Sequence, residues 1–171
     1  MTPEEINKGL SYITYGLYIV TTTFENQKNG MIVNTVFQVT ADPARVAISV
    51  NKQSLTHELI SKSNVFAAMP IDEKSTLPFI GTFGFRSGRT FDKFAKVSYE
   101  IGFLGCPIVK EHTVSYLEVE VQQKVDQGTH TLFIGEVKDV GILNPDGKPM
   151  TYAYYHHMIK GKTPKGATHA S

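Results

Sequence analysis

The sequence contains a single cysteine, Cys106, among its 171 residues. One cysteine cannot form an intrachain disulfide, a CxxC redox pair or a cysteine-held iron–sulfur or zinc site. Excess charge of either sign is also missing, because 17 Lys and Arg against 16 Asp and Glu give a formal net charge of +1. Binding to nucleic acid or to an anionic membrane depends on surplus basic charge, so we expect neither partner.

Long apolar runs and targeting patterns are absent as well. No stretch approaches 18 apolar residues, and the start, MTPEEINKGL, lacks the apolar centre of a signal peptide. We therefore expect a cytoplasmic protein, which suits a single free thiol. The length predicts one domain spanning residues 1–171, in which about 160–171 form a loose or interface tail.

Motifs for metal binding, nucleotide binding and nucleophilic catalysis are missing too. The sequence has neither GxGxxG nor GxSxG, and Gly161-Lys162-Thr163 lacks the first glycine of a phosphate loop, because residue 156 is histidine. Cys106 has no histidine close to it in sequence. Six histidines match no metal-binding spacing, so no metal site is expected; they are His57, His112, His130, His156, His157 and His169.

What is present is mainly β-strand patterning, preceded by a short helix. Thr2 as a cap, Pro3 in the first turn and Glu5 as the third helical residue predict a helix that ends near residues 9–12. Asn29-Gly30 predicts a tight turn between two strands, and Ser54 or Thr56 can cap another short helix. Residues 75–96 indicate a mixture of loop and helix. Strands are expected at 15–24, 31–40, 45–51, 65–69, 113–125, 131–143 and 150–155.

Short strands separated by turns predict a small closed or nearly closed antiparallel barrel. The long helices that alternate with strands in a parallel α/β fold are missing. We therefore predict a mainly β protein, an antiparallel barrel with a few short helices.

The glycine-rich stretch Gly81–Phe94 carries two of the three arginines in the sequence, Arg86 and Arg89, followed by Lys93. A dianionic phosphate needs fixed cations, hydroxyl donors and a backbone that allows close approach, and this stretch supplies all three. The alternative is a basic surface loop whose charges pair with Asp92 and Glu73.

Two further features each allow two interpretations. On the strand at 34–40, Asn34, Val36, Gln38 and Thr40 share one face, which faces either a planar ligand or partner, or simply solvent. His130 follows a tight turn, where it either donates into a cleft at the barrel mouth or lies in solvent. The tyrosines at 152, 154 and 155 predict a core and interface strand, or the wall of an aromatic pocket.

Several sequence blocks, in order, resemble the flavin reductase-like, FMN-binding split-barrel family. The nearest subgroup is that of the flavoredoxins and the flavoprotein portion of high-molecular-weight rubredoxins. The resemblance runs from about residue 10 to 165. It rests on Tyr15-Gly16-Leu17-Tyr18, Asn29–Thr40, Thr56-His57-Glu58-Leu59-Ile60, Phe83–Phe94, Gly128–Val137 and Tyr155–Lys165.

This resemblance implies an antiparallel split β-barrel, a homodimer, and FMN near the subunit interface. It also implies a set of contacts by position. The strand residues Asn34, Thr35, Val36, Gln38, Val39 and Thr40 would lie along the isoalloxazine and ribityl chain. Ser49, Asn51 and Thr56 would bind the ribityl and phosphate end, Ser87, Arg89 and Lys93 the phosphate, and His130 the flavin ring or the nicotinamide side.

The implied function is an NAD(P)H-dependent flavin reductase that passes electrons from NADH or NADPH to flavin and on to an acceptor. His130 or Lys93 would stabilise the negative charge that the flavin acquires. The alternatives are a flavoredoxin-type carrier that exchanges electrons with iron–sulfur proteins without oxidising a nicotinamide directly, and a binding module without redox turnover. High-molecular-weight rubredoxins continue into a domain with two CxxC pairs. We expect a rubredoxin or other electron-transfer partner of this sequence to be a separate chain.

Overall fold

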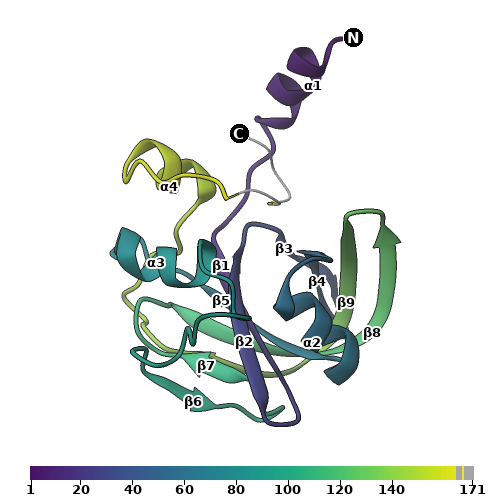
Figure 1. The fold of residues 1–171 in the computed structure, drawn as a ribbon, viewed down its shortest axis with the longest axis vertical. Helices are drawn as coiled ribbons and strands as arrows, with labels where there is room; N and C mark the ends of the chain where they lie inside the picture. The colour runs from purple at the N-terminus through teal and green to yellow at the C-terminus, as the bar shows by residue number, and fades with distance from the viewer. Residues whose placement is uncertain (165–166, 168–171) are drawn as a thin grey trace.

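The computed structural model describes residues 1–164 and residue 167. Its seven-stranded sheet contains β1 (Tyr18–Phe24), β2 (Gln27–Val33), β3 (Val36–Ala41), β4 (Ala44–Asn51), β5 (Val65–Pro70), β8 (Ser115–Gln127) and β9 (His130–Ile142). The order is β2-β1-β5-β8-β9-β4-β3, and all neighbours are antiparallel (Figure 1). Two further strands, β6 (Tyr99–Ile101) and β7 (Pro107–Val109), pair with each other.

The connection between β2 and β3 closes the sheet into a barrel. These strands form its two opposite edges, yet only Asn34 and Thr35 separate them in the chain. A two-residue link can join opposite edges only if the sheet curls until the edges approach each other. The Thr35 carbonyl accepts a hydrogen bond from the Ser49 amide at 3.4 Å, which extends the β3–β4 ladder into this link. The predicted mainly β, split-barrel fold is confirmed.

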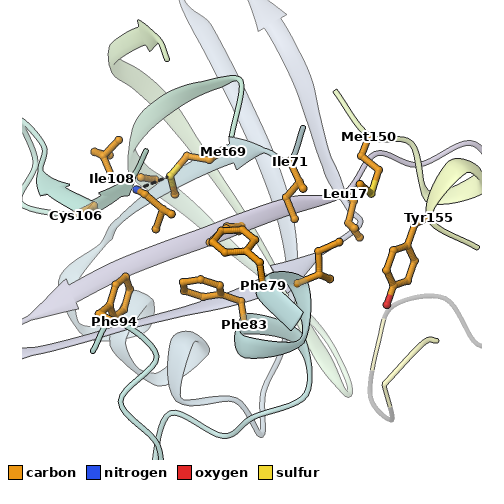
Figure 2. Close-up of a cluster of buried hydrophobic side chains, with 14 of the residues drawn as sticks. Leu17, Met69, Ile71, Phe79, Phe83, Phe94, Cys106, Ile108, Met150 and Tyr155 are labelled. Carbon is orange, nitrogen blue, oxygen red and sulfur yellow. Dashed lines mark hydrogen bonds between the residues drawn. The ribbon is translucent and has the colours of Figure 1, made fainter. Parts of the chain in front are cut away.

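Both faces of the sheet carry apolar clusters. One contains Val20, Ile48, Phe66 and Phe133, all fully buried. Figure 2 shows the other, in which the ring of Phe83 meets those of Phe79 and Phe94 edge to face at 5.7 and 5.6 Å. Such ring pairs stabilise beyond the area that they bury, so they fix the segment around Phe83 against the sheet.

Four helices accompany the strands: α1 (Pro3–Leu10), α2 (Leu55–Ser63), α3 (Leu77–Gly84) and α4 (Tyr152–His157). The predicted capping box of α1 is present, since Thr2 and Glu5 bond to each other's backbone amides. Yet α1 buries no side chain and extends away from the sheet (Figure 1). Ser54, rather than Thr56, caps α2. No described helix is long and apolar enough to cross a membrane.

The predicted Asn29-Gly30 turn is wrong. Both residues lie within β2, paired with Thr22 and Thr21, and the chain reverses just before, where Glu25 adopts a φ of 53°. The glycine serves close packing instead: a Cβ on Gly30 would lie 3.2 Å from the Phe83 ring. The expected strand at 31–40 accordingly divides into β2 and β3.

The strand predicted at 150–155 is also wrong, because this segment forms α4. Thr151 caps the helix and accepts the Tyr154 amide at 3.0 Å. His156 and His157 therefore lie in the last turn of a helix. Tyrosines have no strong helical propensity, and the capping threonine was the missed signal. Of the predicted tail, residues 160–164 and 167 are described, while 165, 166 and 168–171, including His169, lie outside the described residues.

Candidate functional site

Two connected chambers lie where β2, β4, α2, α3 and the C-terminal segment meet. The cationic chamber, of about 320 Å³, is lined among others by Thr56, Arg86, Ser87 and Lys93. The aromatic chamber, of about 50 Å³, is lined among others by Asn34, Ser49, Phe85, His130, Tyr152, Tyr155 and Lys162. Both share Met31, Ile32, Asn51, Gly84, Pro164 and Ala167, so they form one elongated site.

The start of α2 faces the cationic chamber. The Ser54 hydroxyl accepts the His57 amide at 3.1 Å, and the Glu58 amide donates to the Ser54 carbonyl at 3.3 Å. The amides of Leu55 and Thr56 therefore precede the intrahelical hydrogen bonds. Unpaired first-turn amides and the positive end of the helix dipole together favour a bound anion.

Lys93 is the buried cation of this chamber, with only 5% of its surface exposed. Its ammonium donates to the carbonyls of Gly30 at 2.8 Å and Phe83 at 3.1 Å, which ties β2 to α3. Burial lowers the pKa of Lys93 to about 8. Because an ammonium has three N–H donors, one stays available to an anion in the chamber.

The two neighbouring arginines point to different places. Arg86 lines both the cationic chamber and a neighbouring groove, and its guanidinium lies 4.3 Å from the centre of the Phe91 ring in that groove. Arg89 instead forms an ion pair with Glu58 at 3.1 Å and does not line the chamber. The resemblance implied Arg89 as a phosphate contact, whereas Arg86, and not Arg89, lines the cationic chamber. The alternative interpretation, pairing with Asp92 or Glu73, does not occur among the described residues either.

Asn34 gives the aromatic chamber an unsatisfied donor. Its side chain is 6% exposed, and its Nδ2 atom has no hydrogen-bond partner among the described residues, whereas Oδ1 accepts the Thr35 hydroxyl at 3.0 Å. A buried amide without a partner is costly. A ligand carbonyl or ring nitrogen would satisfy it, which fits a planar heteroaromatic ligand.

The register of β4 against β9 brings together polar residues of the aromatic chamber that are far apart in the sequence. Asn51 at the end of β4 pairs with His130 at the start of β9, and Ser49 pairs with Leu132. The ring of His130 meets the Thr129 hydroxyl at 2.9 Å through Nδ1. Its other nitrogen is thereby left for a ligand in the chamber that His130 lines.

The C-terminal segment lies over both chambers and is held there by α4. The Tyr155 hydroxyl donates to the Lys162 carbonyl at 3.0 Å, and the Tyr152 and Thr163 hydroxyls are 2.5 Å apart. His156 Nδ1 donates to the Gly161 carbonyl at 3.0 Å. These three side chains place Lys162 and Pro164 along the site.

The remaining predicted site residues line neither chamber. Thr35 and Val36 line a neighbouring apolar groove, which shares Asn34 with the aromatic chamber. Gln38, Val39 and Thr40 lie further along β3, at the exposed edge of the sheet, where the Gln38 amide donates to the Thr40 carbonyl at 3.1 Å. Seven predicted residues therefore gather, namely Asn34, Ser49, Asn51, Thr56, Ser87, Lys93 and His130.

Sequence reasoning missed the contribution of the C-terminal segment and of Phe85. Tyr155–Lys165 was among the blocks that carry the resemblance, but the tail from about residue 160 was expected to be loose or at an interface, and no site role was given to it. The capping threonine before α4 was the available signal.

Neither a metal site nor a cysteine nucleophile finds support among the described residues. No group of three His, Cys, Asp or Glu side chains there could hold a metal ion. Cys106 is fully buried, and burial together with the nearby Glu118 carboxylate raises the pKa of its thiol. A buried thiol with a raised pKa is a poor nucleophile.

Comparison with known proteins agrees with this geometry. Residues 10–161 match the family described as the flavin reductase like domain. A high molecular weight rubredoxin of Moorella thermoacetica is 48% identical over 160 residues, which cover 94% of this chain and 69% of that protein. A ferric-chelate reductase (NAD(P)H) of Archaeoglobus fulgidus is 45% identical over 156 residues, covering 91% and 92% of the two chains.

Solved structures share the fold at lower identity. The NADH:FAD oxidoreductase SgcE6 of Streptomyces globisporus C-1027 superposes with a TM-score of 0.77 at 22% identity, covering 86% of each chain. The flavin reductase HpaC complexed with NADP+ gives 0.75 at 24% identity, covering 88% of this chain and 93% of that one. The family match along most of the chain and the two close relatives show that this chain belongs to the flavin reductase-like family.

Proposed function

We propose that this protein binds FMN across the two chambers and reduces it with NADH or NADPH, passing the electrons on to an acceptor. The observation that carries the proposal is the polarity of the site. A helix start, Arg86 and Lys93 lie at one end, and the unpartnered Asn34 amide lies at the other. FMN has the same polarity, with a phosphate at one end and a ring edged with hydrogen-bonding atoms at the other.

The cationic chamber supports FMN over FAD. Its donors surround one anionic group: the first-turn amides of α2, Ser87, Arg86 and the third N–H of Lys93. A terminal phosphate is dianionic near neutral pH and fits such a set of donors. These residues bind and orient the phosphate, so the ring end is directed into the aromatic chamber.

Residues of the aromatic chamber orient the ring and exclude water. Asn34, Ser49, Asn51 and His130 offer polar contacts, while Tyr152 and Tyr155 form a wall. A bound flavin supplies the redox chemistry, taking two electrons and a proton from a reduced nicotinamide. No side chain needs to act as a nucleophile, in agreement with a site that holds no catalytic dyad among the described residues.

The names of the two close relatives support the direction of electron flow. One is a ferric-chelate reductase (NAD(P)H), which favours direct oxidation of a nicotinamide. The other is a high molecular weight rubredoxin, which favours electron exchange with an iron–sulfur protein. The second candidate function is therefore a flavoredoxin-type carrier that exchanges electrons with a separate rubredoxin or similar protein.

Anaerobic stopped-flow mixing separates the two functions. The FMN-loaded protein is mixed with NADH and, separately, with NADPH while the absorbance of oxidised flavin is recorded. A reductase loses that absorbance rapidly with at least one of them. Persistence of the oxidised spectrum with both, followed by loss of it when reduced rubredoxin is added, would support the carrier instead.

We further propose that the protein is a homodimer that associates through β3 and the N-terminal segment. Phe37 and Val39 on β3 are 48% and 44% exposed, and Ile6 and Leu10 are exposed on α1. One apolar groove joins the two parts, since Ile13 and Phe37 both line it. Contiguous exposed apolar surface is typical of an interface, and a second copy would also give the otherwise unsupported α1 a packing surface.

A further inference from the structure

Lys162 is the one side chain with a full charge among the described residues that line the aromatic chamber. No acidic side chain pairs with its ammonium among the described residues. The other cations of the site, Arg86 and Lys93, line the cationic chamber instead. Lys93 is further committed to two backbone carbonyls.

The backbone around Lys162 is fixed although its side chain is exposed. The Lys162 carbonyl accepts the Tyr155 hydroxyl, the Gly161 amide donates to the Tyr155 carbonyl at 2.9 Å, and the Thr163 hydroxyl meets Tyr152. Three contacts on consecutive residues hold the segment over the chamber. The backbone from which the Lys162 side chain extends is therefore positioned along the chamber by α4.

Reduction of a flavin by a nicotinamide adds charge at this end of the site. A hydride brings two electrons and one proton, so a neutral ring gains one negative charge, which an adjacent cation stabilises. Resting on the proposed function, we infer that Lys162 is the charge-compensating residue of the site: its ammonium contacts the ring end of the flavin and favours the reduced over the oxidised form.

His130 is the other candidate for this role, and its contacts argue against it. Its Nδ1 atom is already engaged with the Thr129 hydroxyl, which leaves one ring nitrogen to contact a ligand, whereas the Lys162 ammonium has three N–H donors. Lys162 brings a full charge without the cost of burying it, because its side chain remains in contact with water.

The test compares the midpoint potentials of FMN bound to the wild type and to Lys162→Met, Lys162→Arg and Lys160→Met. Loss of the cation lowers the affinity for reduced relative to oxidised FMN about tenfold, which shifts a two-electron potential by about 30 mV to more negative values. Lys162→Arg restores it. Lys160, two residues away and outside both chambers, serves as the matched control and leaves the potential unchanged.

A second measurement needs no turnover. An amine-reactive reagent is applied to the protein with and without FMN, and the modified lysines are quantified by mass spectrometry. FMN protects Lys162 severalfold and leaves Lys160 equally reactive. Equal potentials in the wild type and Lys162→Met, or equal reactivity of Lys162 with and without FMN, would overturn the role of Lys162 while leaving the reductase intact. A wild type that binds no FMN would overturn both proposals.

Discussion

Gly88 packs directly against the side chain of Asn29, so closely that a Cβ at position 88 would lie 2.1 Å from Asn29 Oδ1. Asn29 is buried and donates through Nδ2 to the Thr56 hydroxyl at 2.9 Å. The glycine thus lets the loop that carries Ser87 approach the start of α2. Two walls of the cationic chamber depend on this one contact.

We therefore expect Gly88→Ala to displace Asn29 and weaken FMN binding. Overpacking of this kind costs about 1–3 kcal/mol, and the displaced amide also gives up its bond to Thr56. Fluorescence titration with FMN measures the effect as roughly a tenfold or larger rise in Kd. Gly81→Ala is the control, because a Cβ there makes only an ordinary contact of 3.9 Å with Phe85. An unchanged Kd in Gly88→Ala would show that this loop does not shape the site.

The lowered pKa of Lys93 predicts a pH-dependent stability. Its pKa is about 8 in the folded protein against an ordinary 10.5. Below pH 8 the ammonium is charged in both states, and the fold bears the cost of burying it. Between pH 8 and 10.5 the unfolded chain binds more protons, so the free energy of unfolding rises with pH, by roughly 3 kcal/mol in total.

Comparison with Lys93→Met isolates this contribution from that of other groups. Urea denaturation of both proteins from pH 7 to 10.5 gives the difference in unfolding free energy, which should grow in favour of the wild type as pH rises. Added FMN should shift the rise to higher pH, because a phosphate stabilises the charged form. A difference independent of pH would mean that Lys93 is not titrating in this range.

Local sequence patterns predicted the strands of the barrel better than they predicted where the strands end and the chain turns. The capping box at Thr2 and the strand at 45–51 are visible because each depends on residues close in sequence. The turn predicted at Asn29-Gly30 is wrong because the glycine is needed for close packing against Phe83, which is more than 50 residues away in the chain. Tertiary contacts of that kind leave no local signature.

The residues of the candidate site likewise divide into those that the sequence could identify and those that depend on tertiary contacts. Asn34, Thr56 and His130 were visible from the resemblance, since they lie in the blocks that carry it. The choice between Arg86 and Arg89 was not, because it depends on Glu58 of α2 capturing one of them. Nor was Lys162, whose place over the chamber depends on hydroxyls of α4.

Asn34 provides a test that separates binding from stability. Its Nδ2 atom has no partner in the folded protein, so Asn34→Leu, of similar size, should change the free energy of unfolding by less than about 1 kcal/mol. The Kd for FMN should nevertheless rise about tenfold, the value of one hydrogen bond to the ring. Thermal denaturation without flavin and a fluorescence titration with it give the two numbers. A large loss of stability with unchanged affinity would mean that the amide serves the fold alone.

The proposed dimer predicts a change of mass when β3 is made acidic. Phe37→Asp with Val39→Asp places charge on the exposed edge and should shift the sedimentation coefficient from that of a dimer to that of a monomer. Val140→Asp, on β9 and similarly exposed, should leave the dimer intact. A wild type that sediments as a monomer at micromolar concentration would contradict the proposed homodimer.

The most direct test of the two-chamber site compares FMN with riboflavin, which lacks only the phosphate. Fluorescence titrations of the wild type, Arg86→Ala and Arg89→Ala with both ligands give six affinities. The account predicts that the wild type prefers FMN by at least tenfold, from charge-assisted hydrogen bonds of about 1.5 kcal/mol or more. Arg86→Ala should lose most of that preference and keep its affinity for riboflavin, while Arg89→Ala, held by Glu58, should match the wild type. Equal affinity of the wild type for FMN and riboflavin would contradict the account.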